Sequence, residues 1–561
     1  MKLYPHLFLL LLLPSLAYSQ AGEWTWVKGD STVNSTGSFG IEGVPSPSNT
    51  PPALYAPGFW TDTAGNLWMY GGATMSGYAI GTLWKFDPNI MMWTWMNGDT
   101  LDSPPYFANA SGVFDPLNDP GGLEYGIFTW VDKKNHLWMY GGASDLSASS
   151  DLWQYDPAIN QWAWMNGPQG AYAPPVYGTK LVGNAANTPG GRWETNASWI
   201  DNSGNLWLFG GLDDNLFTYN DMWRYNVTTG NWAWMSGSKN ANDPGSYGPL
   251  GVSSLNYYPS SRSSNLHWQD DSDIFWMAGG GIFFLDNFFI DVWKFDPALL
   301  EWTLVKGSSA LDSVNVASAN CQANMSNQEG GRCENRATWK VCDGLIVNYG
   351  GFTGNWPEFI QNDLWGFLPQ ENEWLEINEY PLTGSYGTQG VASAQNYPTG
   401  RCGSCAFTDK NHNLWMFGGI DSSFFTYNDL WKYVLNPACF GNSFCSVNCN
   451  LSTPVITTNV TTVCPTDSTQ ICAPSGFSSY TWNNNSTGKC IEAKSAGNYY
   501  VTVTDNSGCT AESNHIGIIV HQSPPVSISL SGDTLRVYIT KPMYNGTSTI
   551  TPYRVLHKIY T

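Results

Sequence analysis

Six copies of one pattern run through most of this chain. A diglycine follows an apolar stretch at intervals of 68 to 71 residues, and two series of tryptophans keep step with it. The first glycines of the six pairs are Gly71, Gly141, Gly210, Gly279, Gly350 and Gly418. A fixed period of this length is typical of architectures in which each repeat buries its apolar face against the next one. The sequence therefore predicts a repeat fold.

Each repeat contains four short apolar segments. In the third repeat they span residues 195–201, 206–209, 221–226 and 231–235, separated by turns rich in Gly, Asn and Asp. Such segments indicate antiparallel strands joined by hairpins. Aromatic residues, which suit strands, make up 15% of the chain. Four-stranded units repeated four to eight times are typical of propeller blades, so we expect an all-β, six-bladed β-propeller.

The two ends of the repeat region are out of phase. The region starts with a segment of the fourth-strand type, residues 23–27, and ends on a third strand, residues 430–434. We expect these segments to pair and to complete one blade, which would close the ring and hide the sheet edges. Strand alternation puts the two long connections of every repeat on one face. Because binding usually resides on long loops, that face is the expected binding face.

The order of these landmarks resembles a known family. An apolar strand, Gly-Gly, then Leu-Trp-Lys-Phe-Asp-Pro at 83–88 and a further Trp resemble the kelch motif over residues 23–434. The closest resemblance is to secreted bacterial kelch proteins similar to the galactose oxidase central domain. It implies a kelch-type propeller over residues 20–437. The repeats are longer than ordinary kelch repeats of about 50 residues, and the excess lies in connections such as 237–261.

The N-terminus has the features of an export signal. Lys2 precedes an apolar run at 7–13, and small residues before Gln20 predict a signal peptide over 1–19. The protein is therefore expected to be secreted, either free or held at the cell surface. No later apolar run approaches about 18 residues, so no integral membrane segment is expected in the mature chain. A net charge of −21 argues against nucleic acid as a partner.

The 12 cysteines lie between Cys321 and Cys509, and in an exported chain they predict disulfides. Residues 438–452 form an expected cysteine-rich linker. Residues 453–523 resemble a PKD-like or Ig-like β-sandwich module, and 524–561 a partial module. We predict the pairs Cys464–Cys509 and Cys472–Cys490 in the module. The remaining eight cysteines are expected to pair among themselves, with connectivity left open.

No catalytic constellation is evident. A copper radical oxidase, which the resemblance raises, needs a His pair, and His136 and His412 fall in short turns away from His267. The acidic run 270–273 lacks the Gly and the distant Glu of a calcium loop. We expect no cofactor, no metal site and no catalytic residue. The sequence favours a non-catalytic binding or adhesion protein for a protein or glycan ligand; a carbohydrate-active or copper oxidase-like enzyme is the alternative.

An arginine precedes the first strand of four repeats, at Arg192, Arg262, Arg332 and Arg401. One hypothesis places them in an arc at the mouth of the central channel, where their planar forks would bind carboxylates of the ligand. The alternative is structural, with each arginine bound to carbonyls of the neighbouring blade. Aromatic residues of the second-to-third-strand loops are further candidates, either for ligand contact or for packing these loops: Tyr78, Phe217, Tyr219, Phe289, Trp356, Phe359, Phe425 and Tyr427.

Overall fold

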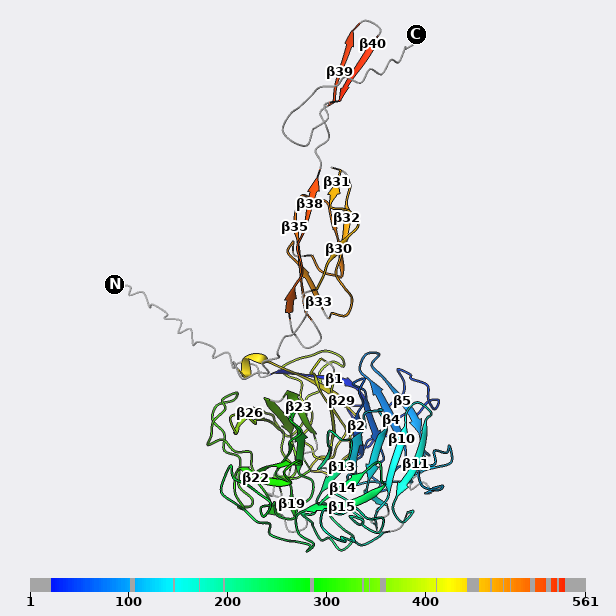
Figure 1. The fold of residues 1–561 in the computed structure, drawn as a ribbon, viewed down its shortest axis with the longest axis vertical. Helices are drawn as coiled ribbons and strands as arrows, with labels where there is room; N and C mark the ends of the chain where they lie inside the picture. Colours follow the sequence, from blue (N-terminus) through cyan, green and yellow to red (C-terminus); the bar gives the residue numbers. More distant parts are fainter. Residues whose placement is uncertain are drawn as a thin grey trace, which may run out of the picture. The chain divides into compact units, whose positions relative to one another are not determined.

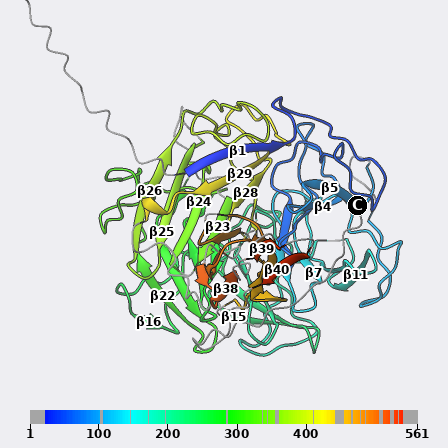
Figure 2. The same ribbon diagram turned by 90° about the horizontal axis from the view of Figure 1, so that it is seen from above.

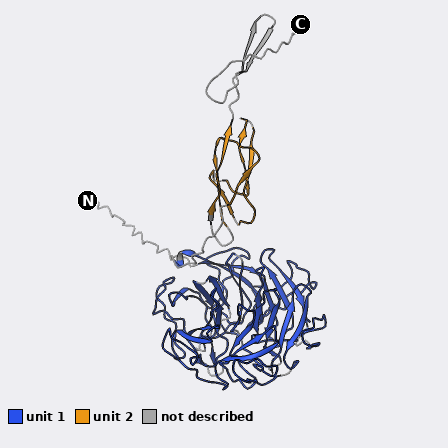
Figure 3. Cartoon of the chain, viewed as in Figure 1, with its two compact units in different colours: residues 1–445 blue, residues 446–561 orange. Residues whose placement is uncertain are grey.

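The computed structural model describes residues 22–539 except residues 101–105, 145–146, 171, 195–196, 283–286, 335–336, 343, 354–359, 410, 441–453, 465–466, 478, 485, 505–509, 521–525 and 532–533. The chain divides into two compact units, residues 1–445 and 446–561 (Figure 3). The expected signal peptide, most of the 438–452 linker and the tail after residue 539 lie outside the described residues.

The first unit is built from antiparallel sheets, six of which have four or five strands among the described residues (Figure 1). We number these sheets 1 to 6 in chain order. Sheet 1 contains β2 (Gly58–Thr61), β3 (Leu67–Tyr70), β4 (Leu83–Asp87) and β5 (Met92–Asn97); sheet 2 contains β6 (Phe128–Val131), β7 (Leu137–Tyr140), β10 (Leu152–Asp156) and β11 (Gln161–Asn166); sheet 3 contains β12 (Ser198–Ile200), β13 (Leu206–Phe209), β14 (Met222–Asn226) and β15 (Asn231–Ser236).

The other three large sheets follow the same strand order. Sheet 4 contains β17 (Leu266–Gln269), β18 (Phe275–Ala278), β21 (Val292–Asp296), β22 (Glu301–Lys306) and a fifth strand, β16 (Ser253–Ser254); sheet 5 contains β23 (Ala337–Cys342), β24 (Leu345–Tyr349), β25 (Asp363–Leu368) and β26 (Glu373–Glu379); sheet 6 contains β27 (Cys405–Thr408), β28 (Leu414–Phe417), β29 (Leu430–Leu435) and β1 (Gly22–Lys28). Two small hairpins, β8 (Ala143–Ser144) with β9 (Ser147–Ala148) and β19 (Gly281–Ile282) with β20 (Asn287–Phe288), lie in connections.

The first strands of the six sheets contact one another in cyclic order. β2 contacts β6, β6 contacts β12, β12 contacts β17, β17 contacts β23, and β23 contacts β27. β27 in turn contacts β2, so the last sheet lies beside the first. Buried indoles bridge neighbouring sheets at several of these junctions. Trp60 Nε1 donates to the carbonyl of Trp138 at 2.8 Å, and Trp199 Nε1 donates to that of Trp268 at 2.9 Å.

Sheet 6 is completed by the N-terminal strand. β1 pairs antiparallel with β29, with Glu23 opposite Val434 and Trp24 opposite Tyr433, although the segments are about 400 residues apart (Figure 2). This confirms the expected pairing of residues 23–27 with 430–434. Trp24 is fully buried and packs against Tyr433 and Trp431, so the strand is anchored by its side chains as well as by its backbone.

The long connections between repeats fold back along the outermost strands. In each sheet one backbone N–H of the connection donates to a carbonyl of the fourth strand, as from Gly43 to Trp95 at 2.7 Å and from Gly390 to Trp26 at 2.8 Å. In sheet 4 this segment is regular enough to form β16, paired with β22. The extra length of the 70-residue repeat therefore covers an otherwise unpaired sheet edge.

A repeated asparagine fastens five of these connections. Asn187, for example, is buried and donates through Nδ2 to the carbonyls of Val182 and Trp232, both at 3.0 Å. The same two bonds are made by Asn49, Asn118, Asn327 and Asn396. The sequence interpretation treated these connections as accessible loops; instead, hydrogen bonds hold them against the sheets.

The second unit is a smaller all-β body. Its described strands are β30 (Thr457–Thr458), β31 (Thr462–Val463), β32 (Thr469–Cys472), β33 (Ser479–Trp482), β34 (Cys490–Ala493), β35 (Gly497–Tyr499), β36 (Val501–Thr504), β37 (Thr510–Glu512), β38 (Ile516–Val520) and the hairpin β39 (Val526–Ser531) with β40 (Thr534–Ile539). Three three-stranded sheets enclose a core that includes Ile471, Trp482, Val501 and Ile518.

Disulfides join cysteines in both units. Cys472 and Cys490, which the sequence pairs, lie opposite each other on β32 and β34 and are bonded. Cys464 is exposed, and its expected partner Cys509 lies outside the described residues, so that pair stays a prediction. A second bond, Cys321–Cys439, ties a connection on sheet 5 to the short 3₁₀ helix Pro437–Cys439 that follows β29. No helix within the described ranges is long and apolar enough to cross a membrane.

Candidate functional site

The four arginines lie inside the sheets. Each is at most 1% exposed and forms an ion pair with an aspartate that immediately precedes or begins the third strand of its own sheet. The pairs are Arg192–Asp221, Arg262–Asp291, Arg332–Asp363 and Arg401–Asp429. The guanidinium groups are therefore not presented to solvent at the mouth of a channel. Their burial in ion pairs favours a structural role over direct contact with a ligand.

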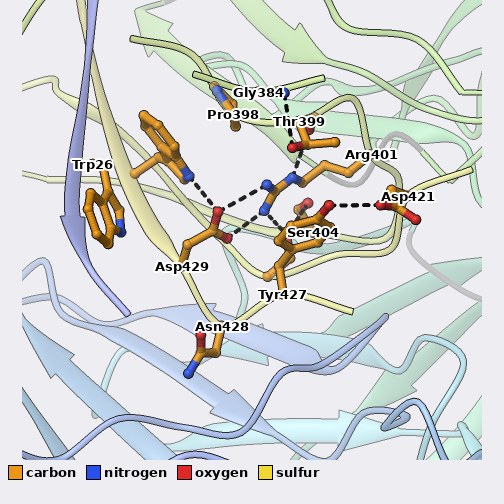
Figure 4. Close-up of polar contacts among 12 residues, drawn as sticks. Trp26, Gly384, Pro398, Thr399, Arg401, Ser404, Asp421, Tyr427, Asn428 and Asp429 are labelled. Atoms are coloured by element: carbon orange, nitrogen blue, oxygen red, sulfur yellow. Dashed lines mark hydrogen bonds and ion pairs between the residues drawn. The ribbon is translucent and has the colours of Figure 1, made fainter. Parts of the chain in front are cut away.

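Arg401 illustrates the arrangement (Figure 4). Its Nη2 donates to Asp429 Oδ2 at 3.0 Å, its Nη1 to the carbonyl of Gly418 at 3.0 Å, and its Nε to the carbonyl of Thr399 at 2.9 Å. Burial opposes its charge, yet the pKa of Arg401 is raised because the charge of Asp429 outweighs that penalty. The arginine therefore stays protonated. We call this unit of arginine, aspartate and their hydrogen-bond partners the Arg–Asp cage.

The aspartate of the cage accepts further bonds. The indole of Trp431 donates to Asp429 Oδ2 at 2.8 Å, and the hydroxyl of Tyr386 donates to the same atom at 2.6 Å. Sheets 3 and 4 repeat both bonds, whereas sheet 5 has Asn315 in place of the tyrosine. A buried carboxylate with this many donors is well compensated for its lost hydration.

The arginine backbone also joins neighbouring sheets. The carbonyl of Arg401 accepts from the N–H of Gly351, the second glycine of the diglycine in sheet 5. Equivalent bonds run from Gly142 to Arg192, Gly211 to Arg262 and Gly280 to Arg332. The side chains themselves bind their own sheets, which differs from the expected contact with carbonyls of the neighbouring blade.

Sheets 1 and 2 lack the cage. Leu54 and Leu123 make the backbone bond that the arginines make elsewhere, so these leucines occupy the arginine position. Sheet 1 also replaces the aspartate with Thr82, whose Oγ1 accepts from Trp84 Nε1 at 3.2 Å. Sheet 2 keeps Asp151, and burial raises the pKa of this carboxyl in the absence of an arginine. Sheet 1 thus lacks both the arginine and the aspartate.

A ring of left-handed residues lies two positions after the arginine or leucine of every sheet. All six have φ between +49° and +64°: Ala56, Tyr125, Glu194, Ser264, Glu334 and Gly403. Backbone bonds link them around the ring, such as Ala56 N to Gly403 O at 2.9 Å and Ser264 N to Glu194 O at 3.0 Å. The Ser264 hydroxyl also contacts the carboxyls of Glu194, at 3.0 Å, and Glu334, at 2.6 Å. Five residues of this ring are buried and Tyr125 is partly buried, and the ring joins the first strands to one another.

Two of the candidate tyrosines support the cages. Tyr219 and Tyr427 are buried, and their rings lie 3.7 and 4.0 Å from the guanidinium carbons of Arg192 and Arg401. Their hydroxyls donate to aspartates that begin the preceding loops, Asp213 at 3.0 Å and Asp421 at 2.7 Å. They therefore connect the cages of sheets 3 and 6 to the loops between the second and third strands of these sheets. Two other aromatic candidates, Trp356 and Phe359, lie outside the described residues.

These two loops present large apolar side chains to solvent. Leu216 and Phe217 are 43% and 45% exposed in sheet 3, and Phe424 and Phe425 are 72% and 39% exposed in sheet 6. We call these four residues the loop tips. The aspartate that begins each loop accepts backbone N–H bonds, including those of Phe217 and Phe425, both at 3.0 Å. The tips are thus apolar, exposed and held in fixed turns.

The three histidines among the described residues of the first unit lie apart from the loop tips. His136 contacts Asp132 in a turn of sheet 2, His412 lies in the matching turn of sheet 6, and burial lowers the pKa of His267 on β17 to about 4. In the part of the chain that the structure describes, no three His, Cys, Asp or Glu side chains come together as a metal site. No protein-family model matches the sequence, and no curated protein is significantly similar to it.

Proposed function

We propose that residues 22–437 form a six-bladed β-propeller of the kelch type, closed by β1, and that it serves as the binding domain of a secreted, non-catalytic protein. Six sheets with one strand order, and first strands that contact one another cyclically, support the propeller. The pairing of β1 with β29 supports its closure. The second unit is proposed to be a PKD-like or Ig-like module, supported by its small sheets around one apolar core.

We place the binding surface at the loop tips. The single observation that carries this assignment is the exposure of Leu216, Phe217, Phe424 and Phe425 on turns anchored by aspartate. Leu216 and Phe424 also adopt left-handed φ values of 62° and 63°, a conformation that costs a non-glycine residue about 1 kcal/mol. Exposed apolar groups in such turns contribute nothing to the core, whereas they suit an interface that excludes water.

The ligand proposed for this surface is a protein. Leu and Phe side chains fill apolar pockets of a partner, whereas glycan sites need more polar groups around each aromatic ring. The two pairs of tips belong to sheets 3 and 6, which are three places apart in the cyclic order, so the partner must offer a broad surface. The exposed Asp214 lies in the first of these loops, and it favours a partner with a basic group beside its apolar patch.

The test compares two sets of matched substitutions. The tip variant carries Leu216→Ser, Phe217→Ser, Phe424→Ser and Phe425→Ser. The control carries Ile41→Ser, Leu117→Ser, Leu250→Ser and Met325→Ser, which alter exposed apolar residues of the outer connections. Exported proteins of the source cells are crosslinked to each purified variant and identified by mass spectrometry. We expect the tip variant alone to lose the partner, with unchanged thermal unfolding. Retention of the partner by the tip variant would refute the assignment.

A further inference from the structure

A pocket of about 350 Å³ opens between sheets 4 and 5, on the side of the short turns. One wall is a row of cross-strand neighbours, Trp276 on β18, Lys294 on β21 and Thr303 on β22. The opposite wall is the turn between β25 and β26, which contributes Gln370 and Asn372. The pocket is at the small end of the size range of ligand sites in proteins.

A polar residue of that turn, Asn372, lines the pocket. Asn372 precedes β26 in the left-handed conformation, with a φ of 57°. The equivalent residue before β22 is Leu300, with a φ of 62°, and its side chain packs against the apolar cluster between sheets 3 and 4. The same backbone therefore carries a packing leucine at one junction and an amide at the next. The change leaves space and adds hydrogen-bonding groups.

The polar groups of the pocket are available to a ligand. Lys294 Nζ lies 5.4 Å from the centre of the Trp276 ring and forms no ion pair with any described residue. Across residues that the structure describes, the side-chain amides of Gln370 and Asn372 have no hydrogen-bond partner. By contrast, the Asp270 carboxylate at the pocket edge already accepts from Ser272 N, Ile274 N and Trp276 Nε1. The groups that remain available to a ligand are therefore one ammonium and two side-chain amides.

We propose that this pocket binds a single acidic sugar residue. The ammonium of Lys294 would hold the carboxylate, and the amides of Gln370 and Asn372, with the hydroxyls of Ser272 and Thr303, would bind the ring hydroxyls. A volume of about 350 Å³ suits one sugar unit rather than a peptide. This site lies on the short turns, so it is separate from the loop tips and does not depend on the protein-binding proposal.

Isothermal titration calorimetry of the full chain with glucuronate tests the proposal, with glucose and acetate as comparison ligands. We expect glucuronate to bind with a Kd of about 1 mM, and glucose and acetate to bind at least about 10-fold more weakly. Lys294→Gln and Asn372→Leu, the second of which installs the leucine of the neighbouring junction, should each weaken glucuronate binding at least about 10-fold. Lys85→Gln is the matched control, because Lys85 lies over Trp68 in sheet 1 in the same way.

Three results would overturn this site. The first is no glucuronate binding by the folded protein at about 20 mM ligand, a concentration well above the expected Kd. The second is acetate binding as tight as that of glucuronate, since it would show that only a carboxylate is recognised. The third is wild-type affinity in Lys294→Gln, because Lys294 is the one cation among the described residues that line the pocket. Thermal unfolding of every variant accompanies the titrations.

Discussion

Single residues decide whether the repeats hold together, and the Arg–Asp cage is the clearest case. The arginines could be recognised in the sequence because they recur before the first strand of four repeats. The sequence did not show that an aspartate 28 to 31 residues further on would take each side chain. The first repeat lacks both the arginine and the aspartate, and this joint absence was the sequence feature that could have revealed the pairing. The burial of the arginines in ion pairs favours a structural role over contact with a ligand.

Replacing Arg401 with Leu should strongly destabilise the protein. It leaves Asp429 buried and unpaired, and breaking a buried pair in this way costs about 3–5 kcal/mol. The control is Arg401→Leu combined with Asp429→Thr, which reproduces the Leu54 and Thr82 of sheet 1 and should recover much of the loss. Urea unfolding measures both. Equal stability of the single and double variants would show that the pair is not coupled.

The buried carboxyl of Glu329 should make the stability of the protein depend on pH. Burial raises the pKa of this carboxyl from 4.5 to about 7, although the adjacent Arg332 opposes the shift. A raised folded pKa means that the carboxyl contributes stability below pH 4.5 and that this contribution is lost as the pH rises towards 7. Glu329→Gln removes the titration. The variant should therefore gain on the order of 2–3 kcal/mol relative to wild type between pH 4.5 and pH 8.

Urea unfolding at several pH values measures this gain, with Glu371→Gln as the control because Glu371 is exposed. The control should follow the wild-type pH profile. If Glu329→Gln also follows it, Glu329 is ionised in the folded protein throughout this range.

Elements were easier to predict than their contacts. The expected strand at 206–209 is β13, and the expected strand at 231–235 is one residue shorter than β15. Alternating apolar residues and Gly or Asn turns mark such strands directly. The connections between repeats lack the apolar pattern that marks the strands, so their return along the fourth strand was missed. The recurring asparagine, at Asn49, Asn118, Asn187, Asn327 and Asn396, was the overlooked signal.

Removing one of these asparagines should loosen a connection. Asn187→Ala deletes two buried hydrogen bonds and leaves the Trp232 carbonyl without its side-chain donor, which we expect to cost about 2 kcal/mol. Hydrogen–deuterium exchange should increase in residues 176–190 and along β15. Asn184→Ala serves as the control, because the Asn184 side chain makes a single exposed bond within its turn. An unchanged exchange rate in Asn187→Ala would contradict the role of Asn187 in holding the connection against sheet 3.

At the scale of the whole molecule, the phase of the repeats predicted that the two ends meet in sheet 6. The ring of left-handed residues that joins the first strands could not be foreseen, since Ala, Tyr, Glu, Ser and Gly share no pattern at those positions. Two of the four loop tips, Phe217 and Phe425, were among the aromatic candidates of the sequence, whereas Leu216 and Phe424 were not. The proposed propeller depends on the closure by β1. A deletion and a disulfide trap test this closure.

Deleting residues 20–29 should expose the edge of β29 in the mature protein. An unpaired strand edge pairs readily with other chains, so we expect aggregation in size-exclusion chromatography. Trp24 would also be lost from the core. A monomeric deletion variant with wild-type thermal unfolding would show that β1 is dispensable.

Closure is tested most directly by trapping the two ends. Glu23 and Val434 are opposite each other on β1 and β29, and Val434 is exposed, so a Glu23→Cys, Val434→Cys variant can form a disulfide across the junction. The control, Glu23→Cys with Lys432→Cys, is two residues out of register. Non-reducing peptide mapping of the folded monomer should find the 23–434 bond in high yield and little of the 23–432 bond. Absence of the 23–434 bond in folded protein, or equal yields of the two bonds, would contradict the closed fold.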